Sequence, residues 1–327
     1  MSLPATTRVL LTGTSGTLGY NVMRLLAKET NHKVLAPVRA VRPFLSPFAS
    51  RVDFQKLDLV DIAATKHYLS HTRPDVIVHC AASGLRPPKA SWFEIISFNV
   101  ETTLRLFETY CASGVRHFVY ISTGLVYREQ GRPLRETDPV ENLHPYGASK
   151  AAADLLLQAA AVEFGRTLTI VRPFAFTGIQ DAGTRLFPQL ITAASSGKPF
   201  CMTTGKQVRD FCAVEDIARA VLLCIERQPQ QAIEKFNVGS GMERTVRQLV
   251  ETVCSALGLK VDLQFGAVPD RAYEPRHLVA DITRARQELG WSPQTSLSYA
   301  VWELAREMAP ALPVREPERK VWAKAAN

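Results

Sequence analysis

The stretch from Arg8 to Gly19, RVLLTGTSGTLG, decides the fold of this 327-residue chain. It opens on an apolar run that is typical of a buried strand. Gly13, Gly16 and Gly19 follow in the spacing GxxGxxG, and a helical pattern then runs from about Thr17 to Lys28. Glycines here permit a tight turn and close approach of the backbone to a ligand, while the helix N-terminus supplies N–H donors. The sequence therefore predicts a pyrophosphate-binding turn between strand and helix.

Short apolar runs alternate with longer helical patterns after this turn. Strands are expected at 33–38, 52–56, 75–82, 117–123 and 167–173. Helices are expected over about 91–113, ended by Gly114, and about 146–164, ended by Gly165. Crossovers of this length imply parallel strands with helices on both faces. The predicted class is α/β, a doubly wound parallel sheet of the Rossmann type.

The alternation loosens after about residue 173. Helices are expected at 186–196, 214–227, 245–257 and 296–308, and strands at 236–238 and 261–265. At about 150 residues per domain, the length suggests roughly two domains. We expect a dinucleotide-binding domain over 1–173, joined by returning segments near 208–240, and a smaller substrate-binding domain mainly over 174–327.

Composition bounds the remaining possibilities. Hydrophobic residues make up 46% and charged residues 21%, which is ordinary for a globular protein. No apolar run reaches the ~18 residues of a membrane span, and the N-terminal stretch lacks the features of a secretory signal, which favours a cytoplasmic protein. The six cysteines include no CxxC pair, and no metal site is expected.

The net charge of +8 favours an anionic partner, although a basic surface without a partner explains it equally well. The basic residues are mixed with acids, and no basic patch with interleaved aromatics appears. We therefore expect no nucleic-acid partner.

The end of the second strand bears on the choice of dinucleotide. In NAD-preferring proteins, an acidic residue about 20 positions after the glycine turn holds the ribose 2′-hydroxyl. Here Val38 and Arg39 stand at that place, without a carboxylate. A guanidinium suits a 2′-phosphate, so Arg39 favours NADP over NAD; the alternative is a solvated loop residue. Asp58 and Leu59 follow the third strand, where Asp58 either contacts adenine or caps the next helix.

A tyrosine and a lysine four residues apart open the helix at about 146. The spacing places Tyr146 and Lys150 on one helical face, where an ammonium is expected to lower the high pKa of the phenol. Such a pair is a general acid/base for alcohol–ketone interconversion. Thr123 ends a strand upstream, at the edge of the sheet where functional groups gather, and can bond the same substrate oxygen.

Together these motifs resemble the extended short-chain dehydrogenase/reductase family, in the NAD-dependent epimerase/dehydratase group that acts on nucleotide sugars. The resemblance covers about residues 7–305. In chain order its motifs are TGTSGTLG, DVIVHCAA, the helical Asn99, FVYISTGLVY, PYGASK, TIVRPF, QVRDFCAVEDIARAV, FNVGSG and ADITRARQELGWSP.

The resemblance implies roles for individual residues. Thr123, Tyr146 and Lys150 would be catalytic. The implied cofactor-binding residues are Gly13, Thr14, Ser15, Gly16, Thr17, Leu18, Gly19, Arg39, Asp58, Leu59, Ala81, Ala82, Ser83, Asn99, Tyr146, Lys150 and Pro173. The implied substrate-binding residues are Thr123, Arg185, Arg209, Arg271 and Glu274.

Arg209 and Arg271 match arginines that meet the nucleotide diphosphate; the alternative for each is an ion pair with a nearby acid. The resemblance also implies a homodimer through the helices at 91–113 and 146–164. The alternative for the second of these helices is packing between the sheet and the substrate domain.

The chain departs from the family pattern at four places. Gly124-Leu125 replaces the Asp-Glu of the 4,6-dehydratases, which argues against dehydration. Ala175 stands where an asparagine normally helps to hold substrate, and Arg185 is a candidate to compensate. Arg128 replaces a usual glycine, and Arg39 replaces the acid that selects NAD.

Three functions are compatible with these residues. Arg39 favours an NADP-dependent reductase of a nucleotide-linked 4-keto-6-deoxy sugar, with Tyr146 as the general acid. The alternative is a nucleotide-sugar C4 epimerase with tightly bound NAD. A non-catalytic cofactor-binding module is the further alternative, disfavoured because Thr123, Tyr146 and Lys150 occur together.

Overall fold

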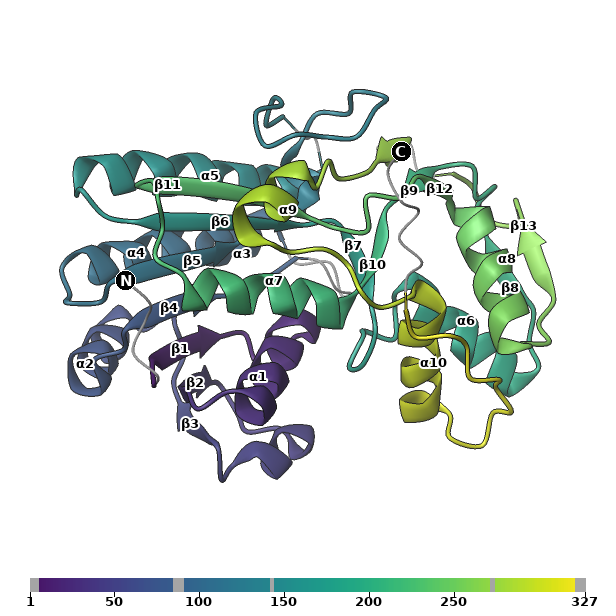
Figure 1. Cartoon of the computed structure of the whole chain (residues 1–327), viewed down its shortest axis with the longest axis horizontal. Coiled ribbons are helices and arrows are strands. Elements are labelled where there is room, and N and C mark those ends of the chain that lie inside the picture. The colour runs from purple at the N-terminus through teal and green to yellow at the C-terminus, as the bar shows by residue number, and fades with distance from the viewer. Residues whose placement is uncertain (1–5, 85–90, 142–143, 271–273, 321–327) are drawn as a thin grey trace.

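A seven-stranded parallel sheet forms the centre of the molecule, as the computed structural model shows (Figure 1). The structure describes residues 6–84, 91–141, 144–270 and 274–320. The strand order β11-β6-β5-β4-β1-β2-β3 reverses direction between β1 and β4, which confirms the doubly wound prediction. The strands are β1 (Arg8–Thr12), β2 (Lys33–Val38), β3 (Val52–Lys56), β4 (Val76–His79), β5 (His117–Ile121), β6 (Leu168–Pro173) and β11 (Ile233–Val238).

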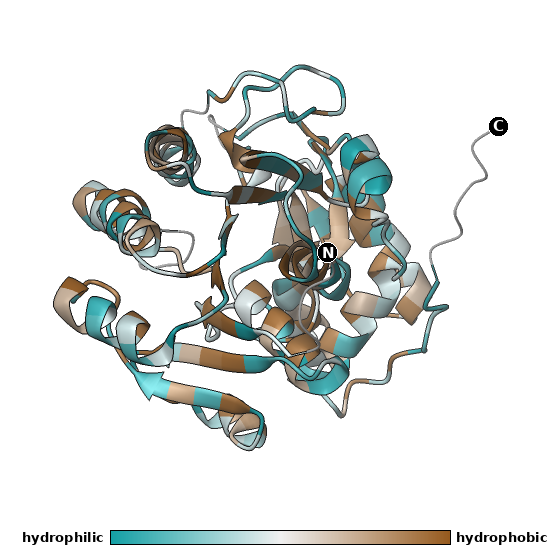
Figure 2. Ribbon diagram, turned by 60° about the vertical axis from the view of Figure 1, so that its left-hand side comes forward, coloured by the Kyte–Doolittle hydropathy of each residue, from teal (hydrophilic) through white to brown (hydrophobic). Residues whose placement is uncertain are grey.

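Helices cover both faces of this sheet. Side chains alternate along β1, so Val9 and Leu11 enter one apolar cluster and Leu10 enters the other. The first cluster also takes in α1 (Thr17–Glu29), α7 (Val214–Glu226) and α9 (Thr283–Leu289). The second takes in α2 (Ile62–Thr72), α4 (Thr103–Cys111) and α5 (Pro145–Glu163). Figure 2 shows the sheet strands mainly in the brown of apolar residues between these two layers.

The helix expected over 91–113 is divided into three parts. It comprises α3 (Trp92–Ile96), the π-helical η2 (Ser97–Thr102) and α4, which ends at Cys111 rather than at Gly114. A capping box between Ser91 and Glu94 starts it. The π-helical turn contains Asn99, and such turns often occur at functional sites.

A third apolar cluster lies beside the carboxyl edge of the sheet, at the right of Figure 1. Phe187, Val250 and Leu304 belong to it and come from α6 (Leu186–Ser196), α8 (Val246–Leu257) and α10 (Leu297–Met308). All four helices expected after residue 173 are present within one or two residues. The structure adds α9, together with the two short helices η1 (Pro43–Phe48) and η3 (Gly124–Val126).

Short strands connect this cluster to the sheet. They pair as β10-β7, β12-β9-β14 and β13-β8. Their bounds are β7 (Ala175–Thr177), β8 (Phe200–Met202), β9 (Val208–Arg209), β10 (Phe211–Ala213), β12 (Arg244–Thr245), β13 (Leu263–Phe265) and β14 (His277–Leu278). Strands of two or three residues carry no alternation pattern, so only β13 among them was predicted. Within the described ranges, no helix has the length and apolarity that a bilayer crossing requires.

Candidate functional site

The glycine turn is shaped by close backbone contacts. Gly13 has a φ of +76°, and a Cβ added there would lie 2.6 Å from the Ala81 backbone nitrogen. A Cβ at Gly19 would collide with the Gly13 carbonyl. The Gly16 N–H closes the turn by donating to that same carbonyl at 2.9 Å. The turn therefore requires glycine and leaves its backbone open to a ligand.

This turn fits the pyrophosphate of a dinucleotide. It leads directly into the 13-residue α1, whose first N–H groups lack partners in the helix itself. The buried Thr14 Oγ1 has no hydrogen-bond partner in the described part of the chain, so a donor or acceptor remains for a ligand. The Thr17 hydroxyl instead donates to the Gln180 carbonyl at 2.9 Å, which leaves Thr17 its backbone N–H. Ser15 is exposed and Leu18 is buried.

The segment after β4 lies beside the turn. The Ala81 N–H donates to Thr12 Oγ1 at 3.2 Å. Asn99 holds Ser83 from both sides, accepting from its N–H at 2.8 Å and donating to its carbonyl at 2.9 Å. The Asn99 amide also donates to Ser149 Oγ at 3.0 Å. Asn99 thus holds the Ala81–Ser83 segment next to α5, and its side-chain amide is used by these hydrogen bonds. Ala82 is exposed.

Arg39 is exposed and directly follows β2. The Leu57 N–H donates to the Val38 carbonyl at 2.9 Å, which places Arg39 beside the end of β3. Arg39 is therefore exposed at the carboxyl ends of β2 and β3, and its contact with a ribose 2′-phosphate stays a prediction.

Asp58 does not cap α2, so that alternative is wrong. The cap is Asp61, whose carboxylate accepts from the Ala64 N–H at 2.9 Å. Asp58 instead accepts from the Val60 N–H at 3.2 Å in a tight turn and is otherwise exposed. Leu59 is buried beside it.

The predicted catalytic residues lie where β5 and α5 meet, near the carboxyl edge of the sheet. Thr123 follows β5 and caps η3, accepting from the Leu125 N–H at 3.2 Å. Tyr146 stands in the first turn of α5 and Lys150 one turn further on. All three are buried, as is Pro173 at the end of β6. The contact of α5 with η3 brings the two segments together.

Burial dominates the electrostatics of this group. It raises the pKa of Tyr146 to about 12, and the Arg185 cation opposes that rise. The prediction that Lys150 lowers this pKa is not met, because burial outweighs the nearby charge and the opposing cation is Arg185. The Lys150 ammonium lies 4.1 Å from the centre of the Tyr120 ring. Burial lowers the pKa of Lys150 itself to about 8, while the Asp154 carboxylate acts to raise it. Tyr146 therefore keeps its proton at neutral pH and can act as an acid.

Arg185 is held in place near Tyr146. It stands at the start of α6, pairs with Asp181 at 2.8 Å and lies 4.7 Å from the centre of the Phe176 ring. Phe176 is the next residue after Ala175. The Arg185 guanidinium therefore lies near the residue for which Arg185 was expected to compensate in substrate binding.

Arg209 and Glu274 form an ion pair at 2.8 Å. Arg209 is mostly buried on β9 and also donates to the Val208 carbonyl. The ion pair that was the alternative for Arg209 is therefore present, and it brings two predicted substrate-binding residues together. Arg271 lies outside the described residues.

Comparison with known proteins then decides the family. The model of the NAD-dependent epimerase/dehydratase family matches residues 9–239. The chain belongs to this family. It is an enzyme of the extended short-chain dehydrogenase/reductase type, whose members act on nucleotide sugars.

Several known proteins are similar over nearly the whole chain. The UDP-glucose 4-epimerase of Mycolicibacterium smegmatis is 31% identical over 308 residues, which cover 90% of this chain and 96% of that protein. The Thermotoga maritima UDP-glucose 4-epimerase, solved with UDP-glucose, is 25% identical with a TM-score of 0.82, covering 92% and 98%. MoeE5, solved with UDP-glucuronic acid and NAD, is 26% identical with a TM-score of 0.83, covering 93% and 100%.

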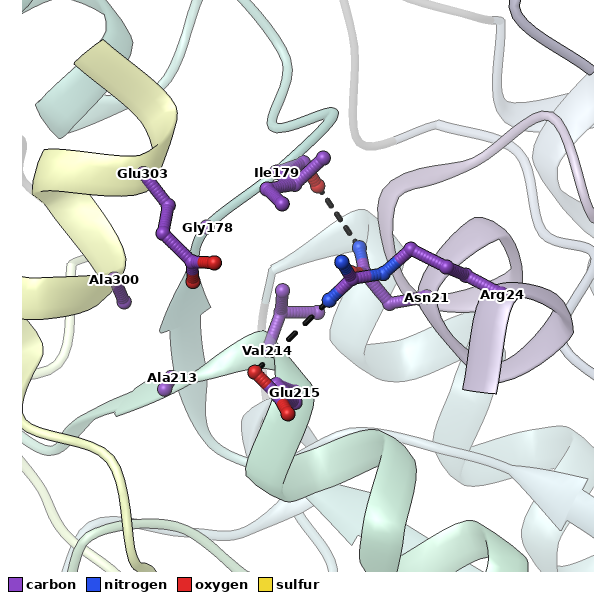
Figure 3. Close-up of a pocket in the computed structure, with 9 residues that line it drawn as sticks. All are labelled: Asn21, Arg24, Gly178, Ile179, Ala213, Val214, Glu215, Ala300 and Glu303. Atoms are coloured by element: carbon purple, nitrogen blue, oxygen red, sulfur yellow. Dashed lines mark hydrogen bonds and ion pairs between the residues drawn. The ribbon is translucent and has the colours of Figure 1, made fainter. Parts of the chain in front are cut away.

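A pocket beside α1 is lined by residues outside this site. Figure 3 shows it between α1, the start of α7 and α10. Asn21 donates to the Ile179 carbonyl at 2.8 Å, and Arg24 pairs with Glu215 at 3.9 Å. The described residues that line this pocket include none of the predicted site residues. Asn21 thus connects α1 to the loop after β7, and Arg24 connects α1 to α7.

Several buried partners of the site are not among the residues predicted from the sequence. Asp154 follows Lys150 by four residues, a spacing that was available as a signal, and pairs with Arg172 of β6. Asp181 could not be found, because its pairing with Arg185 lies in a loop without periodicity. Among the residues that the structure describes, no group of three or more His, Cys, Asp or Glu side chains could hold a metal ion.

Proposed function

We propose that the protein is a nucleotide-sugar 4-epimerase that uses NAD. The observation that carries this proposal is the meeting of Thr123, Tyr146 and Lys150 next to a glycine turn shaped for a dinucleotide. The 4-epimerases of Mycolicibacterium smegmatis and Thermotoga maritima, which match nearly the whole chain, support it.

The residues around the turn would hold the cofactor. The proposed set is the 13–19 turn for the pyrophosphate, Asp58 and Leu59 for adenine, and the Ala81–Ser83 segment with Pro173 along the dinucleotide. NAD, when bound, supplies a reversible hydride acceptor next to the sugar. Lys150 would hold the nicotinamide ribose, and Asn99 would fix the Ala81–Ser83 segment.

Tyr146 would exchange a proton with the sugar C4 oxygen. Oxidation requires loss of the hydroxyl proton to Tyr146, and reduction from the opposite face requires its return, so the protein is unchanged over the cycle. Tyr146 can accept that proton only as the phenolate, a form that burial disfavours because it raises the pKa of this tyrosine. The Arg185 cation and the Thr123 hydroxyl would stabilise the charged states of the tyrosine and the sugar oxygen.

The substrate would lie between the sheet edge and the third apolar cluster. We propose that this cluster, mainly within 174–327, is the substrate-binding part, and that 1–173 with the returning 208–240 segments binds the dinucleotide. Arg209 would meet the diphosphate once Glu274 is displaced or shared, and the bidentate geometry of a guanidinium suits that task.

Arg39 supports a second candidate, an NADP-dependent 4-keto sugar reductase. Its exposed guanidinium stands where an acid would select NAD. NAD accompanies UDP-glucuronic acid in the MoeE5 structure, so the relatives support the epimerase more than the reductase that Arg39 favours.

One assay separates the two candidates. We expect the purified protein to carry NAD and to equilibrate UDP-glucose with UDP-galactose without net cofactor consumption, measured by chromatography of the nucleotide sugars. Protein that arrives empty, and that oxidises NADPH with a 4-keto-6-deoxy nucleotide sugar, would replace this proposal by the reductase.

We also propose a homodimer through α3 and α5. Seven large apolar side chains of these helices and their ends are exposed, a feature typical of interaction surfaces. They are Trp92, Phe93, Ile96, Leu155, Leu156, Val162 and Phe164.

The proposed dimer can be tested by the molar mass of the wild type and of an interface variant. We expect light scattering after gel filtration to give a dimer for the wild type and a monomer for Leu155→Arg/Val162→Arg, because two buried unpaired cations oppose association. Val268→Arg alters an exposed apolar residue elsewhere and is the control. A monomeric wild type at micromolar concentration contradicts the proposal.

A further inference from the structure

We propose that Asp154 and Arg172 are positioning residues that keep the Lys150 ammonium charged and fixed in the site. The inference deepens the proposed function, since it rests on that function for the role of Lys150. Neither residue was expected to take part in the site from the sequence.

The three residues of α5 lie on one helical face. Tyr146, Lys150 and Asp154 follow each other at four-residue steps, the spacing that stacks side chains along a helix. Their exposed fractions fall from 8% through 1% to 0%. The stripe therefore begins at the proposed proton donor and ends deep inside the protein at a carboxylate.

Arg172 anchors that carboxylate to the sheet. Its Nε and Nη2 donate to Asp154 Oδ2 at 3.0 and 2.9 Å, and Nη1 donates to the Tyr127 hydroxyl at 2.7 Å. The Tyr127 hydroxyl donates in turn to Asn237 Oδ1 at 2.7 Å. Residues of β6 and β11 thus fix Asp154 through a continuous buried network, with little freedom for the carboxylate to move away from α5.

The surroundings of Lys150 make Asp154 its natural counter-charge. From the end of β4 it faces His79 and Cys80, and from β5 the Tyr120 ring. Burial lowers the pKa of His79 to about 3 and raises that of Cys80 to about 12, so both are neutral near pH 7. Asp154 lies on the same helix as Lys150, α5. Among the described residues, it is the carboxylate that acts to raise the pKa of Lys150.

A buried ion pair alone is a poor means of stabilisation. Desolvating both charges offsets most of their attraction, and apolar replacements are often as stable. Here the carboxylate serves two cations, Arg172 and Lys150, and both act to lower its pKa against the effect of burial. Retaining the pair has a physical use if its carboxylate also keeps the nearby ammonium protonated.

The prediction concerns the titration of Lys150. Its pKa is about 8 with Asp154 present, so the ammonium is the form below that pH. Asp154→Asn removes the attraction and leaves Arg172 as an unpaired cation. We expect the titration midpoint of Lys150 to fall by at least about one pH unit, so that the amine is largely neutral at pH 8. Arg172→Met added to Asp154→Asn removes the repelling cation and should recover part of that shift.

The test is an NMR titration of cofactor-free full-length protein labelled at lysine Cε, with the Lys150 signal assigned by its loss in Lys150→Arg. Asp216→Asn is the matched control. Asp216 is also fully buried, and it accepts from the backbone N–H groups of Gln294 and Thr295 rather than facing Lys150. The Asp216→Asn variant should be less stable than the wild type but should have the same Lys150 titration midpoint.

The order of midpoints decides the outcome. The proposal is supported if the Lys150 titration midpoint is highest in the wild type, intermediate in the double variant and lowest in Asp154→Asn. Equal midpoints in wild type and the double variant overturn the proposal and leave Asp154 and Arg172 as a structural ion pair. If Asp154→Asn does not fold, the double variant is compared with the wild type, because it does not leave the Arg172 guanidinium buried without its carboxylate. Because this titration needs neither cofactor nor substrate, failure of the epimerase assay alone would refute the proposed function and not this inference.

Discussion

Tyr146→Phe is expected to lower kcat by about 10²- to 10⁴-fold, the usual contribution of a general acid/base. The change removes one hydroxyl and keeps the ring that is buried in the first turn of α5. Dinucleotide affinity should stay within about twofold, because the proposed contacts to the cofactor come mainly from the 13–19 turn. Nucleotide-sugar chromatography gives the rate, and a fluorescence titration with NADH gives the affinity.

A second buried tyrosine provides the control for this variant. The Tyr110 hydroxyl on α4 donates to the Thr167 carbonyl at 2.8 Å, remote from the site. Tyr110→Phe should cost about 1 kcal/mol of unfolding free energy for the lost hydrogen bond and leave kcat unchanged. If Tyr146→Phe retained full turnover, another group would have to move the proton, and the assigned role of Tyr146 would be wrong.

Gly13→Ala is expected to weaken dinucleotide binding at least about tenfold, or 1.4 kcal/mol. Two costs coincide at this residue, a φ of +76° and a Cβ placed 2.6 Å from the Ala81 backbone nitrogen. Backbone atoms cannot rotate away as a side chain can, so the turn must open and lose its shape for the pyrophosphate. We also expect a loss of about 1–3 kcal/mol in the free energy of unfolding, measured by urea denaturation.

Gly131→Ala separates the two costs. Gly131 has a similar φ of +67°, but an added Cβ would meet nothing within 4 Å among the described atoms. Only the left-handed backbone penalty remains, about 1 kcal/mol of stability with no effect on NADH binding. Equal loss of NADH binding in both variants would mean that the effect of Gly13→Ala comes from general destabilisation and not from the shape of the turn.

The strands and helices that could be predicted share a local cause. The five central strands of the sheet, β2, β1, β4, β5 and β6, are short apolar runs buried over nearly their whole length, a pattern visible in the letters themselves. The glycine turn and the Tyr146–Lys150 spacing are equally local. The π-helical turn at 97–102 and the two- and three-residue strands could not be predicted, because packing and not periodicity selects them.

The sequence alone determined the doubly wound architecture, the dinucleotide turn and the proposed proton donor, since each depends on neighbours within a few positions. Only the tertiary structure decided which charges meet. It joined Arg209 to Glu274, brought Arg185 to Tyr146, and placed Arg172 on Asp154 beside Lys150. It also reversed the expected sign of the Tyr146 shift, because a pKa depends on burial and on charges distant in the chain, which no spacing contains.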